Sequence, residues 1–318
     1  MRLTSNTSIV RRRPRFERGN QTQRARLTER DLDILEQVAN HRFLRALDAA
    51  RLVGGSEKKV IERVGQLFYA GYLDRPAAQG EYYRAGGGSE PIIYAISNEG
   101  ARVLIEAKRL APSRALTWAR KNDEVKRPSI HHTLSVADLS IRLVNAATAR
   151  GDIHLQLRSD LLKTLPAQTQ AAKSPFTLTV PLIHQGAAIK ISNKPDLAFG
   201  LVYPDGNRRC FLVEVDRGSM PVERKNFDQT SILRKLIGYE TARQQELHKS
   251  QFGWRNFRVL FVTDTASRAD SIIKAIASRD RISQSPLFLV TDRASLETSA
   301  DIFTHQWRTP TRYVDLIS

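Results

Sequence analysis

The chain has 318 residues and a mass of 35.9 kDa, a length that predicts one large domain or two of ordinary size. Its 50 lysines and arginines against 33 acidic residues leave a formal charge of +17, which favours nucleic acid as the partner over an anionic membrane. No run approaches the ~18 apolar residues that span a bilayer, and the single cysteine excludes intrachain disulfides, so we expect a cytoplasmic protein without a membrane partner.

The first 26 residues predict a basic arm. Seven arginines and one glutamate occur between Arg11 and Arg26, without any apolar period. This composition is typical of a disordered segment that follows a phosphate backbone or enters a minor groove, with Arg11, Arg12 and Arg13 as its first contacts. A solvated tail without a target is the alternative.

Residues 27–110 predict a winged helix-turn-helix. Apolar residues at helical spacing indicate helices over residues 28–44, 45–54 and 56–73. A strand, a glycine-rich tip at residues 86–88, a second strand and a fourth helix follow. Lys58, Lys59 and Arg63 lie on the solvent face of the third helix, where major-groove contacts are usually made, and Arg84 on the wing is expected to reach a phosphate. A winged helix used for protein contact is the alternative.

The rest of the chain predicts an α/β domain. Residues 111–130 are charged and bounded by prolines, which indicates a linker. From residue 131 to 318 the order is helix, several strands, a long helix over residues 223–247, strand, helix, strand, with an insertion or hairpin between residues 161 and 188. This alternation favours an α/β (α+β) fold with a mixed sheet.

Three carboxylates interrupt a hairpin that is otherwise apolar, over residues 194–218. Asp196 lies in its first run, Glu214 and Asp216 lie in its second, and residues 203–207 form the turn. Alternation places Glu214 and Asp216 on one face. A turn centred on Asp205 sets Asp196 opposite Glu214, and a turn centred on Gly206 sets it opposite Asp216, whereas a two-residue loop would point it to the other face.

Clustered acids repel one another, and a hard divalent cation relieves that repulsion. Mg²⁺ (or Mn²⁺) takes carboxylate oxygens together with water and phosphate, as phosphodiester hydrolysis requires. We therefore predict a metal site at Asp196, Glu214 and Asp216. The alternative is a set of acids that are solvated at the sheet edge or paired with arginines.

These residues carry a resemblance. Pro195-Asp196, a hairpin, then Glu214-x-Asp216 resembles the PD-(D/E)xK core of restriction-type nucleases. The run from Asp196 through "FLVEVDRG" to "LRKLIGYE", behind a winged helix, is more closely similar to the replication-relaxation family, which includes MobC-type plasmid-mobilisation relaxases. The similarity extends from about residue 28 to residue 290. It implies a restriction-endonuclease-like domain that nicks or cleaves DNA of a plasmid or other mobile element.

One position departs from the nuclease pattern, because Asp216 stands where a lysine is usual. Some members of the superfamily carry that cation on the following helix in a Gln/Lys-x-x-x-Tyr motif, which Lys235 and Tyr239 match; Lys225 is the other candidate. The resemblance also makes His132 a site-proximal residue, with capping or phosphate contact as the simpler role.

The sequence thus predicts a Mg²⁺-dependent DNA endonuclease or relaxase that binds double-stranded DNA, with a homodimer possible. The first alternative is a non-catalytic regulator, or a replication or mobilisation accessory factor, on a degenerate nuclease scaffold. The second is a module that recruits protein partners.

Overall fold

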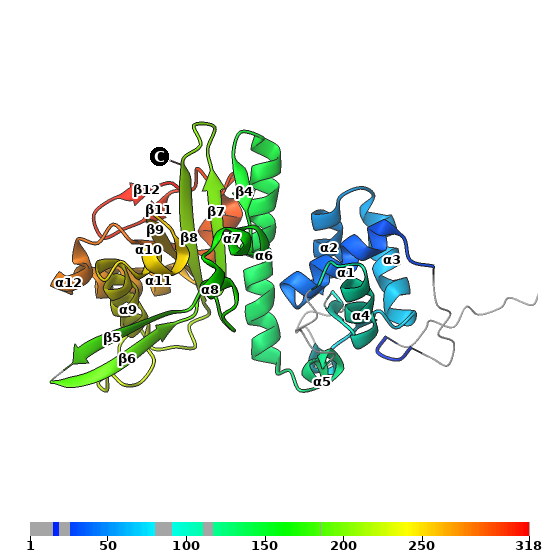
Figure 1. The fold of residues 1–318 in the computed structure, drawn as a ribbon, viewed down its shortest axis with the longest axis horizontal. Coiled ribbons are helices and arrows are strands. Elements are labelled where there is room, and N and C mark those ends of the chain that lie inside the picture. Colours follow the sequence, from blue (N-terminus) through cyan, green and yellow to red (C-terminus); the bar gives the residue numbers. More distant parts are fainter. Residues whose placement is uncertain (1–14, 19–25, 80–90, 111–116, 185, 318) are drawn as a thin grey trace, which may run out of the picture. The chain divides into compact units, whose positions relative to one another are not determined.

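The computed structural model describes residues 15–18, 26–79, 91–110, 117–184 and 186–317 (Figure 1). The chain forms two compact units, residues 1–141 and 142–318. The division falls inside helix α6 (Arg127–Arg150), whereas the sequence places a boundary before residue 131. The predicted linker contains helix α5 (Trp118–Asp123) and the first turn of α6. None of the described helices is long and apolar enough to cross a bilayer.

The N-terminal unit has the element order of a winged helix. Its elements are α1 (Glu29–His41), β1 (Leu44–Arg45), α2 (Ala46–Val53), α3 (Glu57–Tyr69), β2 (Leu73–Asp74), the short 3-10 helix η1 (Ala77–Gln79), β3 (Ile93–Ile96) and α4 (Asn98–Glu106). The strands form an antiparallel sheet in the order β1-β3-β2. The predicted glycine-rich tip and Arg84 lie outside the described residues.

Local sequence explains the helices of this unit. Thr28 accepts a hydrogen bond from the Asp31 amide, and Asp31 accepts one from the Thr28 amide, which is a reciprocal capping box. The apolar face of α1, including Ile34 and Val38, is completely buried against the apolar face of α3, including Val64. The spacing of apolar residues, with a period of 3.6, therefore predicted these helices correctly.

The second unit is built on a mixed sheet of seven strands, in the order β12-β11-β10-β9-β8-β7-β4. The strands are β4 (His154–Gln156), β7 (Leu197–Val202), β8 (Arg208–Asp216), β9 (Phe257–Thr263), β10 (Phe288–Asp292), β11 (Trp307–Arg308) and β12 (Tyr313–Val314). Strands β8, β9 and β10 run parallel, and the other pairs are antiparallel. The predicted α/β (α+β) fold with a mixed sheet is confirmed.

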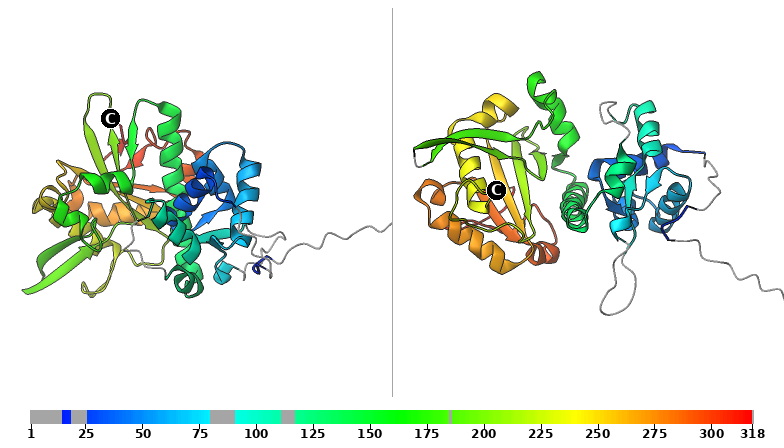
Figure 2. Two further views of the ribbon diagram at one scale, coloured as in Figure 1. Left: turned by 45° about the vertical axis from the view of Figure 1, so that its right-hand side comes forward. Right: turned by 90° about the horizontal axis from the view of Figure 1, so that it is seen from below.

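Helices and a separate hairpin complete this unit. The helices are α7 (Arg158–Thr164), α8 (Ala167–Gln170), α9 (Ile232–Gln244), α10 (Leu247–Phe252), α11 (Ala266–Ala277), α12 (Asp280–Ser283) and α13 (Arg293–Thr298). The hairpin joins β5 (Leu178–His184) to β6 (Ala187–Asn193), so the predicted insertion contains both short helices and a hairpin. The hairpin extends away from the main sheet beside α9 (Figure 2).

Helix α9 begins later than its sequence pattern predicts. The pattern indicates a helix from about residue 223, but the structure begins it at Ile232. Ser231 caps it by accepting a hydrogen bond from the Arg234 amide at 3.2 Å. Asn226 accepts from the Asp228 amide at 2.8 Å, a local turn that competes with a helix. Helix α9 then packs on the sheet through side chains such as Leu236 and Tyr239, both fully buried.

Candidate active site

The hairpin formed by β7 and β8 has the register expected for a turn centred on Asp205. Leu197 pairs with Val213, and the register continues to Val202 and Arg208. Asp196 directly precedes β7, and its amide donates to the Val213 carbonyl at 2.8 Å. Continuing the register by one residue sets Asp196 opposite Glu214. Of the two registers predicted for an odd loop, the one centred on Asp205 is confirmed.

The ends of this hairpin are fixed by local hydrogen bonds. Asp205 accepts a hydrogen bond from the Asn207 amide at 2.9 Å, so this acid forms the turn. Gly206 has a φ of +79°, which glycine adopts without strain. At the other end, Asp196 Oδ2 accepts from the Val215 amide at 2.8 Å. That bond holds one oxygen of Asp196 beside the backbone that follows Glu214.

Glu214 is the centre of the candidate site. Its side chain is only 2% exposed, and both of its oxygens accept hydrogen bonds from α9. Lys235 Nζ donates to Oε2 at 2.5 Å, and Tyr239 Oη donates to Oε1 at 2.6 Å. Lys235 and Tyr239 meet the same carboxylate because residues four apart share a helix face. The predicted Lys-x-x-x-Tyr pair is therefore beside Glu214.

The electrostatics of the group are dominated by burial. Burial raises the pKa of the Glu214 carboxyl, the Lys235 ammonium opposes that rise, and the negative charge of Asp196 adds to it. Burial also raises the pKa of Tyr239 well above its usual value, and the charges of Glu214 and Asp196 reinforce the effect. Asp196 therefore acts electrostatically on both neighbours, and Tyr239 remains a hydrogen-bond donor.

Asp216 is engaged elsewhere. Its Oδ2 accepts a hydrogen bond from Arg268 Nε of α11 at 2.6 Å, and its Oδ1 accepts from the Gly218 amide at 3.2 Å. Arg268 also donates to the Met220 carbonyl, so it ties the end of β8 to the segment that follows. Across the described ranges, no three His, Cys, Asp or Glu side chains form a group that could hold a metal ion. The predicted cluster of three acids is not formed there.

The remaining candidates for this site have different positions. Lys225 is exposed in the irregular segment between β8 and α9, and it takes no part in the hydrogen bonds of Glu214. Lys235 is therefore the lysine that reaches the carboxylate. His132 is half-buried on α6, within the N-terminal unit. Its proximity to the acids stays a prediction.

The predicted DNA-contacting residues divide into two groups. Lys58 and Lys59 are exposed in the first turn of α3, as a groove contact requires. Arg63 instead forms a two-bond ion pair with Asp31, which is 1% exposed, at 2.7 and 2.8 Å. Its guanidinium ties α3 to the capped start of α1, and its role as a groove contact stays a prediction.

Part of the predicted disordered arm lies against the N-terminal unit. Arg18 donates to the carbonyls of Phe68 at 3.0 Å and Leu73 at 2.7 Å, and it pairs with Asp74. Residues 15–18 therefore have a defined place beside the end of α3. Arg11, Arg12 and Arg13 lie outside the described residues, so their role as DNA contacts stays a prediction.

Sequence reasoning missed two residues that position α9. Asn193 Nδ2 donates to the Lys235 carbonyl at 2.8 Å, and a Cβ at Gly238 would lie only 2.6 Å from Ile191 Cγ2. A glycine inside an otherwise helical pattern is a signal of close packing, and Gly238 could have been read that way. No comparable feature of the sequence indicated that Arg268 would pair with Asp216.

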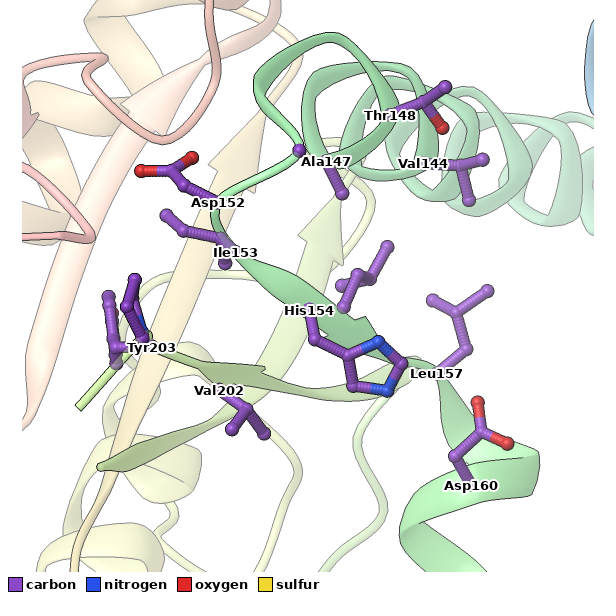
Figure 3. A pocket seen from close by; sticks show the side chains of 13 residues that line it. Val144, Ala147, Thr148, Asp152, Ile153, His154, Leu157, Asp160, Val202 and Tyr203 are labelled. Carbon is purple, nitrogen blue, oxygen red and sulfur yellow. The ribbon is translucent and has the colours of Figure 1, made fainter. Parts of the chain in front are cut away.

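A cavity of about 590 Å³ at the β4 edge does not include the candidate site (Figure 3). Its lining includes His154, Tyr203 and two acids, Asp152 and Asp160. Asp152 is held by Arg150, with its two oxygens at 2.9 and 3.0 Å from the guanidinium. The cavity therefore offers no free acidic pair, and none of the predicted site residues lines it.

One comparison with known proteins gave a match. The family model described as replication-relaxation matches residues 35–254, about two-thirds of the chain. The matched region includes α3, the β7–β8 hairpin and α9. No curated protein and no solved structure matches the chain.

Proposed function

Because the chain belongs to the replication-relaxation family, we propose that it binds DNA of a plasmid or other mobile element and hydrolyses a phosphodiester bond there. The observation that carries the chemistry is the convergence of Glu214, Lys235 and Tyr239, with Asp196 in register beside them. An acid pair with an adjacent ammonium is what metal-dependent phosphodiester cleavage uses.

Two carboxylates on neighbouring extended segments fit a hard divalent cation. Mg²⁺ is commonly held by one or two carboxylates, with water and substrate phosphate as the other ligands. Asp196 and Glu214 provide that number, and the like charge of Asp196 already disfavours the ionised form of Glu214. When bound, Mg²⁺ or Mn²⁺ would supply Lewis-acid stabilisation of the phosphate and a more acidic water.

The chain's own residues have distinct roles in this proposal. Lys235 places an ammonium next to the acids, where it offsets negative charge on the attacked phosphate. Tyr239 orients the Glu214 carboxylate by donating to Oε1. Asp216 is a positioning residue, because its pair with Arg268 fixes the end of β8 rather than offering a free ligand. Lys58 and Lys59 on α3 bind the DNA that the site acts on.

Supercoiled plasmid tests the proposal directly. Wild-type protein with Mg²⁺ or Mn²⁺ should produce nicked or linear DNA, and Asp196→Asn and Glu214→Gln should abolish the product. Asp205→Asn is the matched acid control, because Asp205 belongs to the turn. Lys235→Met should reduce cleavage by about 10²-fold or more, whereas Lys225→Met, the matched lysine control, should leave it unchanged. Equal activity of Glu214→Gln and wild type would refute the assignment.

A non-catalytic DNA-binding regulator or accessory factor is the second candidate. It is favoured by the internal hydrogen bonds of both Glu214 oxygens and by Asp216 in place of the usual lysine. This candidate predicts normal DNA affinity and no product at any metal concentration. A protein-recruitment module would instead show little DNA affinity even at low salt.

A further inference from the structure

A second cavity of the C-terminal unit lies at the opposite end of the central strands from Glu214. It has a volume of about 1060 Å³, and Cys210 and Phe257, which are paired near the starts of β8 and β9, both line it. Glu214 lies four residues further along β8, or roughly 13 Å at the rise of a strand. The cavity is therefore separate from the candidate active site.

Cations dominate the wall of this cavity. Its lining includes Arg208, Arg209, Arg243, Lys249, Arg255 and Arg258, together with His248, against only two acids, Asp205 and Glu246. Two of the cations have acidic neighbours: Arg243 pairs with Glu240 at 2.6 Å, and Lys249 pairs with Glu246 at 2.5 Å. Arg209 donates to the Leu316 carbonyl at 3.2 Å, which does not neutralise its charge. The wall thus carries a clear excess of positive charge.

Arg258 is the most unusual of these cations. Its Nη1 is buried and has no hydrogen-bond partner among the described residues. Burial lowers the pKa of its guanidinium, the positive charges of Arg209 and Arg312 lower it further, and Tyr203 and Asp315 act in the opposite direction. Arg258 and Arg312 also line an adjacent cavity of about 310 Å³. A buried donor without a hydrogen-bond partner is unfavourable until an acceptor, such as an anion, binds to it.

We propose that this arginine-lined cavity binds a phosphate group, with Arg258 as its central donor. Guanidinium groups suit phosphate because they donate two parallel hydrogen bonds. The volume of about 1060 Å³ lies just above the ~300–1,000 Å³ range of small-ligand sites, which leaves room for a phosphate with its attached groups. The phosphate comes from a nucleic-acid backbone or from a free polyphosphate. Only the first source rests on the DNA-binding part of the proposed function, and neither depends on Glu214.

Thermal unfolding with inorganic pyrophosphate tests the site without DNA. At ~100 times its dissociation constant, pyrophosphate should raise the melting temperature of the full-length protein by roughly 5 °C or more. Arg258→Gln and Arg255→Gln should each reduce the shift. Arg255 is exposed, so its substitution tests the site even if Arg258→Gln does not fold. Lys173→Gln is the matched control, since it removes one exposed charge outside the cavity.

Binding of duplex DNA at a series of salt concentrations identifies the source. If the backbone occupies the cavity, Arg255→Gln should lower the slope of log affinity against log salt by about 0.9, whereas Lys173→Gln should not. If Arg255→Gln loses the rise in melting temperature with pyrophosphate but keeps the wild-type salt slope of DNA binding, the cavity binds a free polyphosphate. An equal pyrophosphate shift in wild type and both arginine variants, with equal slopes, would overturn the proposal. The pyrophosphate assay contains neither DNA nor a divalent metal, so its outcome does not depend on whether the protein cleaves DNA.

Discussion

Replacement of Lys235 by methionine should destabilise the second unit in a pH-dependent way. Glu214 is 2% exposed and Lys235 is 27% exposed, with 2.5 Å between Nζ and Oε2. Loss of one partner of a buried ion pair costs about 3–5 kcal/mol. In the variant Tyr239 still donates to Oε1, and in the wild type Lys235 is partly hydrated. We therefore expect Lys235→Met to lower the free energy of unfolding by about 2–3 kcal/mol when Glu214 is ionised.

The pH dependence follows from the raised pKa of Glu214. Burial raises that pKa in the folded state, so the folded protein favours the protonated acid, and the contribution of Glu214 to stability falls as the pH rises through the folded pKa. Lys235 opposes this rise, so its loss moves the folded pKa higher still. The penalty for Lys235→Met should therefore be largest at about pH 8 and should shrink towards about pH 5.

Urea unfolding followed by tryptophan fluorescence measures this penalty. Trp254 and Trp307 are buried in the second unit, and Trp118, the third tryptophan of the chain, is replaced by phenylalanine to remove the signal of the first unit. In a Glu214→Gln background, Lys235→Met should cost less than about 1 kcal/mol, because no ion pair remains. The reasoning would be refuted if Lys235→Met lowered the free energy of unfolding equally at about pH 8 and about pH 5, or equally with and without Glu214→Gln.

Three further outcomes are expected. Arg63→Ala should lower the stability of the first unit by about 3 kcal/mol, measured by thermal unfolding, because it leaves the buried Asp31 carboxylate unpaired. Gly238→Ala should destabilise the second unit by about 1–3 kcal/mol in urea unfolding, although alanine usually favours a helix, because its Cβ would lie 2.6 Å from Ile191. The Cys210 thiol, whose pKa burial raises to about 11, should react with a thiol reagent at neutral pH only after unfolding. A rapid reaction of the folded protein would contradict this.

The β7–β8 hairpin and helix α9 show how much of the candidate site short-range sequence patterns predict. The strand period of two residues and an odd turn limited the partner of Asp196 to Glu214 or Asp216, and the turn centred on Asp205 in the structure decided for Glu214. The helical spacing of Lys235 and Tyr239 was enough to place both on one face of α9. The start of α9 was predicted too early, because the turn at Asn226 and the cap at Ser231 compete with the helical pattern.

The sequence by itself determined most of the elements and the strand and helix faces on which the acids and lysines lie, since these depend on residues close together along the chain. Only the tertiary structure decided which charges meet. Arg268 neutralises Asp216 from 52 residues away, and Arg63 holds Asp31 across 32 residues. Such pairs depend on how helices pack on a sheet or on one another, and no local spacing encodes that packing. For this reason one predicted metal ligand and one predicted DNA contact are held in ion pairs within the fold.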